Sequence, residues 1–398
     1  MKKTLLEIFK SGVRNADPYD LVIRHMGLTN NKLYVLSKNK KITIDLKSYN
    51  RIIVVGAGKA SAKMAYAIEK ILKGKIDTGL VAVKSIYKKP FKKIKQIAAG
   101  HPIPNEKSKN AAQKIFDLVE NVDEKTLVIG LISGGGSSLL CLPKDISLKT
   151  KIQLTDKYLK SGVDIFKLNR IRKKLSMIKG GKLAQRMLPA TSLNFILSDV
   201  VGDDISIIAS GLTDYQDDRI KNIIIGNNMS GLKGCEQRAK RLGFTTILIK
   251  KPITGSVDQA SKYFFNLAKN KIKQQKFLKQ PICIIAGGET TVKVKGSGRG
   301  GRCQEMVLGF LNMIKLSDFD FNRVSFLACG TDGTDGPTQY AGAYFDFKTL
   351  KKIKTLKWDI ETYLDKNDSN TALKKLNALI KTGPTETNVG DIQLLIIK

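Results

Sequence analysis

Glycine and arginine residues are concentrated in the segment Gly-Ser-Gly-Arg-Gly-Gly-Arg at 296–302. Residues 291–295 alternate as in a β-strand, and apolar residues at helical spacing follow from Met306. A glycine-rich turn that opens a helix offers N–H groups without helical partners and the positive end of the helix dipole. We therefore predict a phosphate-binding turn; the alternative is a flexible turn with solvated arginines. Its predicted ligands are Gly298, Gly300, Gly301 and Arg302.

A second glycine-rich turn follows the apolar segment 126–132, which is typical of a buried strand. Its sequence is Ser-Gly-Gly-Gly-Ser-Ser at 133–138. Three consecutive glycines leave backbone N–H groups accessible on both sides of the chain, which favours an oxyanion ligand over a simple connection. The predicted nucleotide- and phosphate-binding residues here are Ser133, Gly134, Gly135, Gly136 and Ser137.

A third turn, at residues 56–59, connects a buried strand to a helix and opens a βαβ unit. It lacks the third glycine of a dinucleotide-binding fingerprint, and the next strand ends at Lys84 instead of an acidic residue. The spacing does not match a P-loop either. Lys59 stands where an ammonium group can reach a phosphate, although a solvated lysine at a helix start is equally compatible with the pattern.

Polar residues follow further buried strands. Asp199 and Asn227 come directly after two of them in the first half of the chain, and Glu289 and Asp332 after two in the second half. In open α/β sheets this strand edge binds ligands. Because carboxylates beside phosphate sites commonly hold Mg²⁺, we predict Glu289 and Asp332 as metal ligands, with Ca²⁺ at 332–336 as the alternative. His101 lies at a similar turn, and its role stays open.

Residues 151–188 have a helical and strongly basic pattern. Arg172 with Lys179, or Arg170 with Lys173, would share one helix face and could hold a substrate carboxylate. A solvated basic face is the alternative. Arg172 and Lys173 are the predicted substrate-binding residues.

The chain has 398 residues and a formal net charge of +34. Its lysines are spread along the whole sequence, and there is one tryptophan, so we do not expect a dedicated nucleic-acid-binding protein. The five cysteines form no Cys-x-x-Cys pair and lie mostly in apolar segments, as in a reduced cytoplasmic protein. No segment resembles a membrane span. We expect small-molecule ligands, a cytoplasmic location, and either a monomer or a dimer.

The alternation of strands, glycine turns and helices predicts an α/β fold, and it restarts near Arg241. We therefore predict two α/β domains, one at 1–240 and one at 241–398, whose polar strand ends converge if the domains face each other across a cleft. Phosphoryl transfer fits the predicted ligands, because it needs cations and N–H groups around the γ-phosphate of ATP and a carboxylate for Mg²⁺.

Several of these segments together resemble the glycerate 2-kinases that carry a MOFRL domain. They are Gly-Ala-Gly-Lys-Ala at 56–60, Ser-Gly-Gly-Gly-Ser at 133–137, Lys-Lys-Leu-Ser at 173–176 with Lys-Gly-Gly at 179–181, Ser-Asp-Val-Val-Gly-Asp at 198–203, Gly-Gly-Glu-Thr at 287–290, Gly-Gly-Arg-Cys-Gln-Glu at 300–305, Gly-Thr-Asp-Gly-Thr-Asp-Gly-Pro-Thr at 330–338 and Thr-Gly-Pro-Thr-Glu-Thr-Asn-Val at 382–389. The chain departs from the family pattern at Lys174, Cys303 and Leu212.

The resemblance implies ATP-dependent phosphorylation of D-glycerate to 2-phosphoglycerate with Mg²⁺, in a cleft between a Rossmann-like N-terminal domain at 1–240 and a smaller C-terminal MOFRL domain at 241–398. It also implies that Lys59 and Arg302 lie in the active site, with Asp199 nearby. On this basis, we expect Lys59 and Arg302 to neutralise the transferring phosphoryl group, Asp199 to accept the hydroxyl proton, and Arg172 or Lys173 to bind the carboxylate. The alternative activity is a nicotinamide-dependent hydroxypyruvate reductase, which the incomplete dinucleotide fingerprint disfavours.

Overall fold

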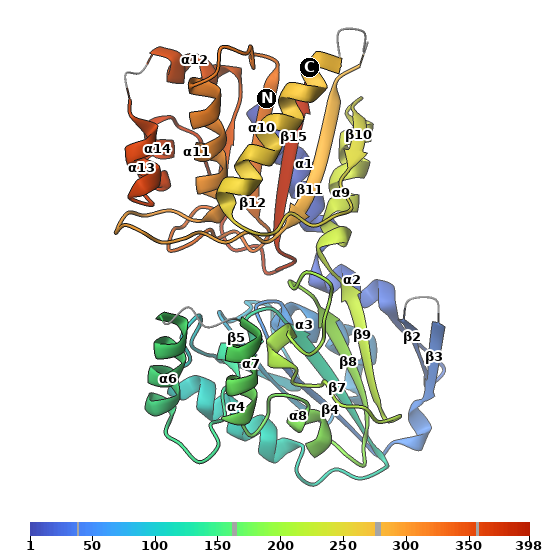
Figure 1. Ribbon diagram of the computed structural model, residues 1–398. Coiled ribbons are helices and arrows are strands. Elements are labelled where there is room, and N and C mark those ends of the chain that lie inside the picture. Colours follow the sequence, from blue (N-terminus) through green and yellow to red (C-terminus); the bar gives the residue numbers. More distant parts are fainter. Residues whose placement is uncertain (38–39, 161–164, 275–279, 356–357) are drawn as a thin grey trace. The chain divides into compact units, whose positions relative to one another are not determined.

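The computed structural model describes residues 1–37, 40–160, 165–274, 280–355 and 358–398, and contains two compact units (Figure 1). The N-terminal unit comprises residues 17–227, and the C-terminal unit comprises residues 1–16 and 228–398. The α/β fold class is confirmed. These bounds differ from the predicted division at 240/241, because residues 1–16 and residues 228–240 both belong to the C-terminal unit.

That first helix, α1 (Lys2–Asn15), packs against α9 (Asn228–Arg241). Its buried apolar face shares a hydrophobic cluster with the buried face of α9. Gly12 lets the two helices approach closely, since a Cβ at this position would lie 2.4 Å from Cys235 Sγ. An ion pair between Glu7 and Arg238 also joins the two helices. Packing over more than 200 residues of sequence separation therefore sets the unit boundary.

The N-terminal unit is built on a parallel sheet with the strand order β6-β5-β4-β7-β8-β9, the order of a Rossmann fold. The strands are β4 (Arg51–Ala57), β5 (Thr78–Val83), β6 (Ile94–Ala98), β7 (Thr126–Ser133), β8 (Thr191–Leu197) and β9 (Ile220–Gly226). The order reverses between β4 and β7, so their carboxyl ends form the topological switch point at which such sheets bind ligands.

The remaining elements of this unit include a small antiparallel sheet and short helices. The small sheet contains β1 (Met26–Thr29), β2 (Lys32–Ser37) and β3 (Lys40–Asp45). The helices are α2 (Pro18–His25), α3 (Ser61–Leu72), α4 (Glu106–Leu118), α5 (Gly136–Leu139), α6 (Leu148–Lys160), α7 (Ile165–Lys174) and α8 (Lys182–Arg186), with 3-10 turns η1 (Leu46–Ser48), η2 (Lys73–Lys75) and η3 (Ile208–Ser210). The basic stretch predicted as helical at 151–188 is thus divided, because residues 175–181 are not helical.

The C-terminal unit contains a mixed sheet in the order β10-β11-β15-β12-β13-β14. Its strands are β10 (Thr245–Leu248), β11 (Ile282–Gly288), β12 (Val324–Gly330), β13 (Gly342–Phe345), β14 (Leu379–Ile380) and β15 (Asp391–Ile397). Side chains of β11 alternate between two hydrophobic clusters, one shared with α10 (Val257–Gln274) and α11 (Arg302–Lys315), the other with α1 and α9. Further helices are α12 (Phe347–Thr355), α13 (Ile360–Asp365) and α14 (Ser369–Lys375).

All five cysteines lie in the described part of the chain as buried free thiols, as predicted from their apolar surroundings. Within the described ranges, no helix combines the length and the hydropathy needed to cross a bilayer.

Candidate active site

The carboxyl ends of β4 and β7 are joined by hydrogen bonds between two of the predicted turns. The Lys59 N–H group donates to the Gly134 carbonyl oxygen at 2.9 Å, and the Ala60 N–H group donates to Ser133 Oγ at 3.0 Å. Gly58, at φ 145°, is required here because a Cβ would lie 2.0 Å from Ser133 Oγ. The 56–59 turn and the 133–138 turn therefore form one structure at the switch point.

Lys59 and His101 both lie beside Gly135. A Cβ placed on Gly135 would be 3.3 Å from Lys59 Cγ and 2.9 Å from His101 Nε2. Gly135 has φ 83°, which favours glycine independently of this crowding. The structure thus brings Lys59 and His101 together beside the 133–138 turn.

Lys179 also holds the 133–138 turn, whereas the sequence had suggested this lysine only as a partner of Arg172 for a substrate carboxylate. Lys179 is 3% exposed, and its Nζ donates to the Ser137 carbonyl oxygen at 2.7 Å and to Ser137 Oγ at 2.8 Å. Ser137 Oγ lies 2.8 Å from Ser210 Oγ. Burial lowers the pKa of Lys179 to about 7, with Cys141 opposing the shift and Lys151 adding to it.

Arg172 and Lys173 lie in the last turn of α7. Burial lowers the pKa of Arg172, and Cys141 opposes this shift. The aliphatic part of Lys173 lies against Gly180, where a Cβ would be 3.2 Å from Lys173 Cδ. Because α7 ends at Lys174, Arg172 and Lys179 do not share a helix face, contrary to the pairing considered from the sequence. Arg170 is exposed.

Asp199 and Asn227 follow the neighbouring strands β8 and β9, as predicted. The two strand ends are linked by the Ser198 N–H group, which donates to the Gly226 carbonyl oxygen at 2.9 Å. The Asn227 side-chain amide donates to Asp203 Oδ2 at 2.6 Å, so this amide orients a carboxylate. Asp199 is partly exposed at the ligand-binding edge of the sheet.

In the C-terminal unit, Arg302 binds two carboxylates. Its Nε donates to Asp391 Oδ2 at 2.6 Å and its Nη2 to Asp391 Oδ1 at 2.9 Å, while Nη1 donates to Glu289. Burial acts to lower the pKa of Arg302, but Asp391 and then Glu289 outweigh it and raise that pKa above its usual value. Two N–H groups of the guanidinium fork are therefore committed to one buried aspartate.

Asp391 was missed by the sequence prediction, although Gly390 and Asp391 directly precede the final apolar strand. In the sheet, Asp391 opposes Gly288 of β11 on one side and Gly330 of β12 on the other. A Cβ at Gly330 would lie 3.5 Å from both Asp391 Oδ1 and Asp332 Oδ1. The antiparallel register thus brings the start of β15 to the edge where Glu289 and Asp332 follow their strands.

The 296–302 turn has a structure different from the predicted phosphate-binding turn. Residues 292–295 form no strand. The Gly298 N–H group donates to the Lys366 carbonyl oxygen at 2.8 Å, and a Cβ on Gly300 would lie 2.1 Å from Ser369 Oγ. These glycines therefore permit close packing against the 366–369 segment.

The N-terminus of α11 already binds an anion, the side chain of Asp335. The N–H groups of Cys303 and Gln304 donate to its two carboxylate oxygens at 3.1 and 2.9 Å, and the Gln304 amide donates to Oδ2 at 3.0 Å. A Cβ on Gly301 would lie 2.3 Å from Asp335 Oδ1. Burial raises the pKa of Asp335 to about 7 against the effect of these donors. The helix end that was predicted to bind phosphate is thus capped by the chain itself.

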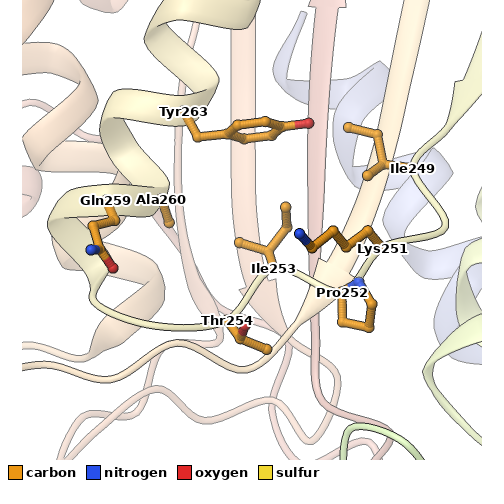
Figure 2. A pocket seen from close by; sticks show the side chains of 8 residues that line it. All are labelled: Ile249, Lys251, Pro252, Ile253, Thr254, Gln259, Ala260 and Tyr263. Carbon is orange, nitrogen blue, oxygen red and sulfur yellow. The ribbon is translucent and has the colours of Figure 1, made fainter.

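A pocket of about 310 Å³ lies beside β10 and α10 in the C-terminal unit (Figure 2). Figure 2 shows the Tyr263 ring and the Lys251 side chain near Ile253. The pocket is lined by Ile249, Lys251, Pro252, Ile253, Thr254, Gln259, Ala260 and Tyr263, none of which is a predicted site residue.

Comparisons with known proteins find two family matches in the chain. Residues 4–233 match a family described as a domain of unknown function (DUF4147), and residues 282–391 match the MOFRL family. Glycerate 2-kinase of Pyrococcus horikoshii is 34% identical over 98% of this chain and 96% of its own length. D-glycerate 2-kinase of Thermotoga maritima is 35% identical over 90% of this chain and 93% of its own.

A crystal structure of glycerate kinase from Thermotoga maritima has a TM-score of 0.82 with this chain at 33% identity. The similarity covers 100% of this chain and 99% of that one. The chain belongs to the glycerate 2-kinase family and contains both a DUF4147 and a MOFRL match.

Proposed function

We propose that this protein transfers the terminal phosphoryl group of ATP to the 2-hydroxyl group of D-glycerate. Family membership supports a small-molecule kinase. The observation that carries the proposal is the position of Lys59, which lies beside the triple-glycine turn at the switch point of a Rossmann-type sheet. An ammonium group and backbone N–H groups at that point suit the charge of a transferring phosphoryl group.

The N-terminal unit supplies groups for the phosphoryl group and for the acceptor. Lys59 and the N–H groups of the 133–138 turn stabilise the negative charge on the phosphoryl oxygens. Asp199 takes the proton from the 2-hydroxyl group as that oxygen forms its bond to phosphorus and ADP leaves. Arg172 and Lys173 provide the positive charge for the glycerate carboxylate.

The C-terminal unit supplies carboxylates and an arginine. Arg302 orients Glu289 and contacts the phosphoryl group with the N–H bonds that Asp391 does not use.

Mg²⁺ fits the carboxylates of this unit. Within the described ranges, no three His, Cys, Asp or Glu side chains are grouped as a metal site, but Mg²⁺ typically uses only one or two carboxylates together with phosphate oxygens and water. Asp332 and Glu289 are the candidates, because both oxygens of Asp391 bind Arg302. Bound there, Mg²⁺ would neutralise charge on the nucleotide phosphates.

The geometry at 56–60 disfavours the reductase alternative. In a dinucleotide-binding fold the pyrophosphate binds the N–H groups at the first strand-to-helix turn. Here the N–H groups of Lys59 and Ala60 donate to Gly134 and Ser133, and Ser133 Oγ lies where a ligand would approach Gly58.

Phosphorus NMR of the reaction with ATP and D-glycerate tests the proposal directly. We expect ADP and a new resonance of glycerate phosphorylated at the 2-hydroxyl. A parallel incubation with hydroxypyruvate and NADH should show no loss of NADH absorbance. Absence of phosphorylated glycerate, or NADH oxidation dependent on the enzyme, would refute the proposed function.

A further inference from the structure

Lys179 is a buried cation that joins three segments of the N-terminal unit. Its Nζ donates to two oxygens of Ser137 in the 133–138 turn. Ser137 Oγ meets Ser210 Oγ of η3, and the Ser210 carbonyl oxygen accepts the N–H group of Gly180, next to Lys179, at 3.0 Å. A closed ring of hydrogen bonds therefore links the glycine turn, η3 and the 179–181 segment.

The charge environment of Lys179 is unusual for a lysine. The groups that act on it are the Cys141 thiol, which favours its charge, and the cations Lys151 and Arg172, which oppose it. Among the residues with described positions, no carboxylate forms an ion pair with Lys179. Its charge is stabilised by the oxygens of Ser137, and burying a cation with so little compensation is costly. A hydrophobic residue would fill the same volume at lower cost, so stability alone does not account for this lysine.

The backbone of η3 is strained where the ring closes. Ala209 and Ser210 are not glycines, yet they have φ values of 50° and 61°. Ala209 also limits the space beside the 133–138 turn, because a Cβ on Gly136 would lie 2.9 Å from Ala209 Cβ. Strained conformations of this kind persist where the surrounding contacts hold them, and they are concentrated at functional sites.

We propose that Lys179 is a positioning residue for phosphoryl transfer, which holds the 133–138 turn through Ser137 so that the turn's N–H groups meet the phosphoryl group. This inference rests on the proposed function. Electrostatic stabilisation of a transition state requires donors that are already fixed in place, so a turn without this support binds substrates but stabilises the transition state less well. Lys179 itself is too deeply buried to contact a substrate.

The test compares Lys179→Met with Lys151→Met. Lys151 is an internal control, because it is equally buried, at 4% exposed, and belongs to the same group of cations, but its Nζ donates to the Leu175 carbonyl oxygen and not to the turn. We expect Lys179→Met to lower kcat about 10²-fold, with KM for glycerate changed less than about threefold. Lys151→Met should change kcat less than about threefold.

Ser210→Ala provides a second measurement that retains the buried charge. It removes the hydroxyl that lies beside Ser137 Oγ, and we expect it to lower kcat. In the double variant with Lys179→Met, the loss of transition-state stabilisation should be smaller than the sum of the two single losses. If Lys179→Met does not fold, Ser210→Ala and the pH profile decide. Because Lys179 donates to Ser137 as an ammonium group and burial lowers its pKa to about 7, we expect wild-type kcat to fall as pH rises through 7, and this limb should shift in Ser210→Ala.

Three results would overturn the inference while leaving the proposed function intact. They are wild-type kcat in folded Lys179→Met, equal losses in both lysine variants, and a Ser210→Ala enzyme with unchanged kcat and pH profile. Lack of glycerate phosphorylation by the wild-type chain would instead refute the proposed function.

Discussion

The two glycine-rich turns, at 133–138 and 296–302, have similar sequences and opposite electrostatic surroundings. The first is held by the cation Lys179 and has Lys59 beside it. Among the residues that the structure describes, no carboxylate contacts this turn by a hydrogen bond or ion pair. The second has three aspartates around it. Asp368 accepts a hydrogen bond from the Arg299 N–H group, and Asp391 accepts from the Arg302 side chain. Asp335 accepts from the N–H group of Cys303 at the start of α11.

This difference shows that a glycine-rich strand-to-helix segment does not by itself define a phosphate site. At 296–302 the glycines allow the 366–369 segment and Asp335 to approach, and the N–H groups of α11 already have an anion. At 133–138 Gly135 allows Lys59 and His101 to approach. We propose that the first turn binds the phosphoryl group, whereas the second holds carboxylates and Arg302 in position.

The largest expected effect is a loss of kcat when Lys59, beside the 133–138 turn, is replaced. Lys59→Ala should lower kcat about 10²- to 10³-fold, because it removes a fixed cation from the transferring phosphoryl group. Steady-state kinetics with ATP and D-glycerate measure this loss. Lys70→Ala, an exposed lysine on the same helix α3, is the control and should retain wild-type activity. Equal activity of the two variants would show that Lys59 does not take part in phosphoryl transfer.

The next effect concerns the carboxylates near the 296–302 turn. Asp391→Asn should lower the free energy of unfolding by about 2 kcal/mol, because it removes the fully buried carboxylate that accepts two hydrogen bonds from Arg302, whose side chain is 32% exposed. Urea denaturation measures this change. The exposed Asp365, whose carboxylate is 3.9 Å from Lys295, is the control, and Asp365→Asn should change stability by less than about 0.5 kcal/mol. A stable Asp391→Asn protein would contradict the role assigned to this pair.

A pair of glycine substitutions tests the two turns against each other. Gly301→Ala should cost about 1–3 kcal/mol of stability, since its Cβ would meet the buried Asp335 carboxylate. Gly135→Ala should mainly reduce kcat, by about tenfold or more, because its Cβ displaces Lys59 and His101 and the residue has φ 83°. Thermal denaturation and kinetics on both variants distinguish these outcomes. A Gly301→Ala variant that loses activity but keeps its stability would contradict the structural role assigned to the 296–302 turn.

The smallest expected effects are changes of folding stability with pH, and they have opposite signs for Asp335 and Lys179. Asp335 has its pKa raised from 3.8 to about 7, so its contribution to stability is fully present below pH 3.8 and is lost as pH rises through 7. Lys179 has its pKa lowered from 10.5 to about 7, so its contribution is present above pH 10.5 and is lost as pH falls through 7.

Denaturation of wild type, Asp335→Asn and Lys179→Met between pH 5.5 and 8.5 separates the two contributions. Each should account for a slope of at most about 1.4 kcal/mol per pH unit. Relative to wild type, the stability of Asp335→Asn should improve as pH rises, and that of Lys179→Met should improve as pH falls. The same trend in both variants would contradict the assignment.

The strand-and-turn pattern of the N-terminal unit was predictable, because it depends on local signals. Buried apolar strands followed by glycines indicated the turns at 56–59 and 133–138, and the α/β fold is confirmed. A parallel sheet brings the carboxyl ends of its strands together, so the proximity of Lys59 to the 133–138 turn followed from the fold class.

The features that the sequence did not reveal depend on partners remote in the chain. Asp335 caps a helix that begins more than 30 residues earlier, and Asp391 reaches Arg302 through the register of the last strand. Residues 292–295 alternate like a strand but bond to Asn367 at their end instead. Lys179 appeared to continue a helix that ends at Lys174. No local pattern specifies these pairings.

A crystal structure with ATP bound in a non-hydrolysable form tests the comparison most directly. The account predicts that the terminal phosphate lies against the N–H groups of 134–137 and the Lys59 ammonium, while Asp335 stays bound to the start of α11. A terminal phosphate bound to the N–H groups of Cys303 and Gln304, with Asp335 displaced, would contradict it.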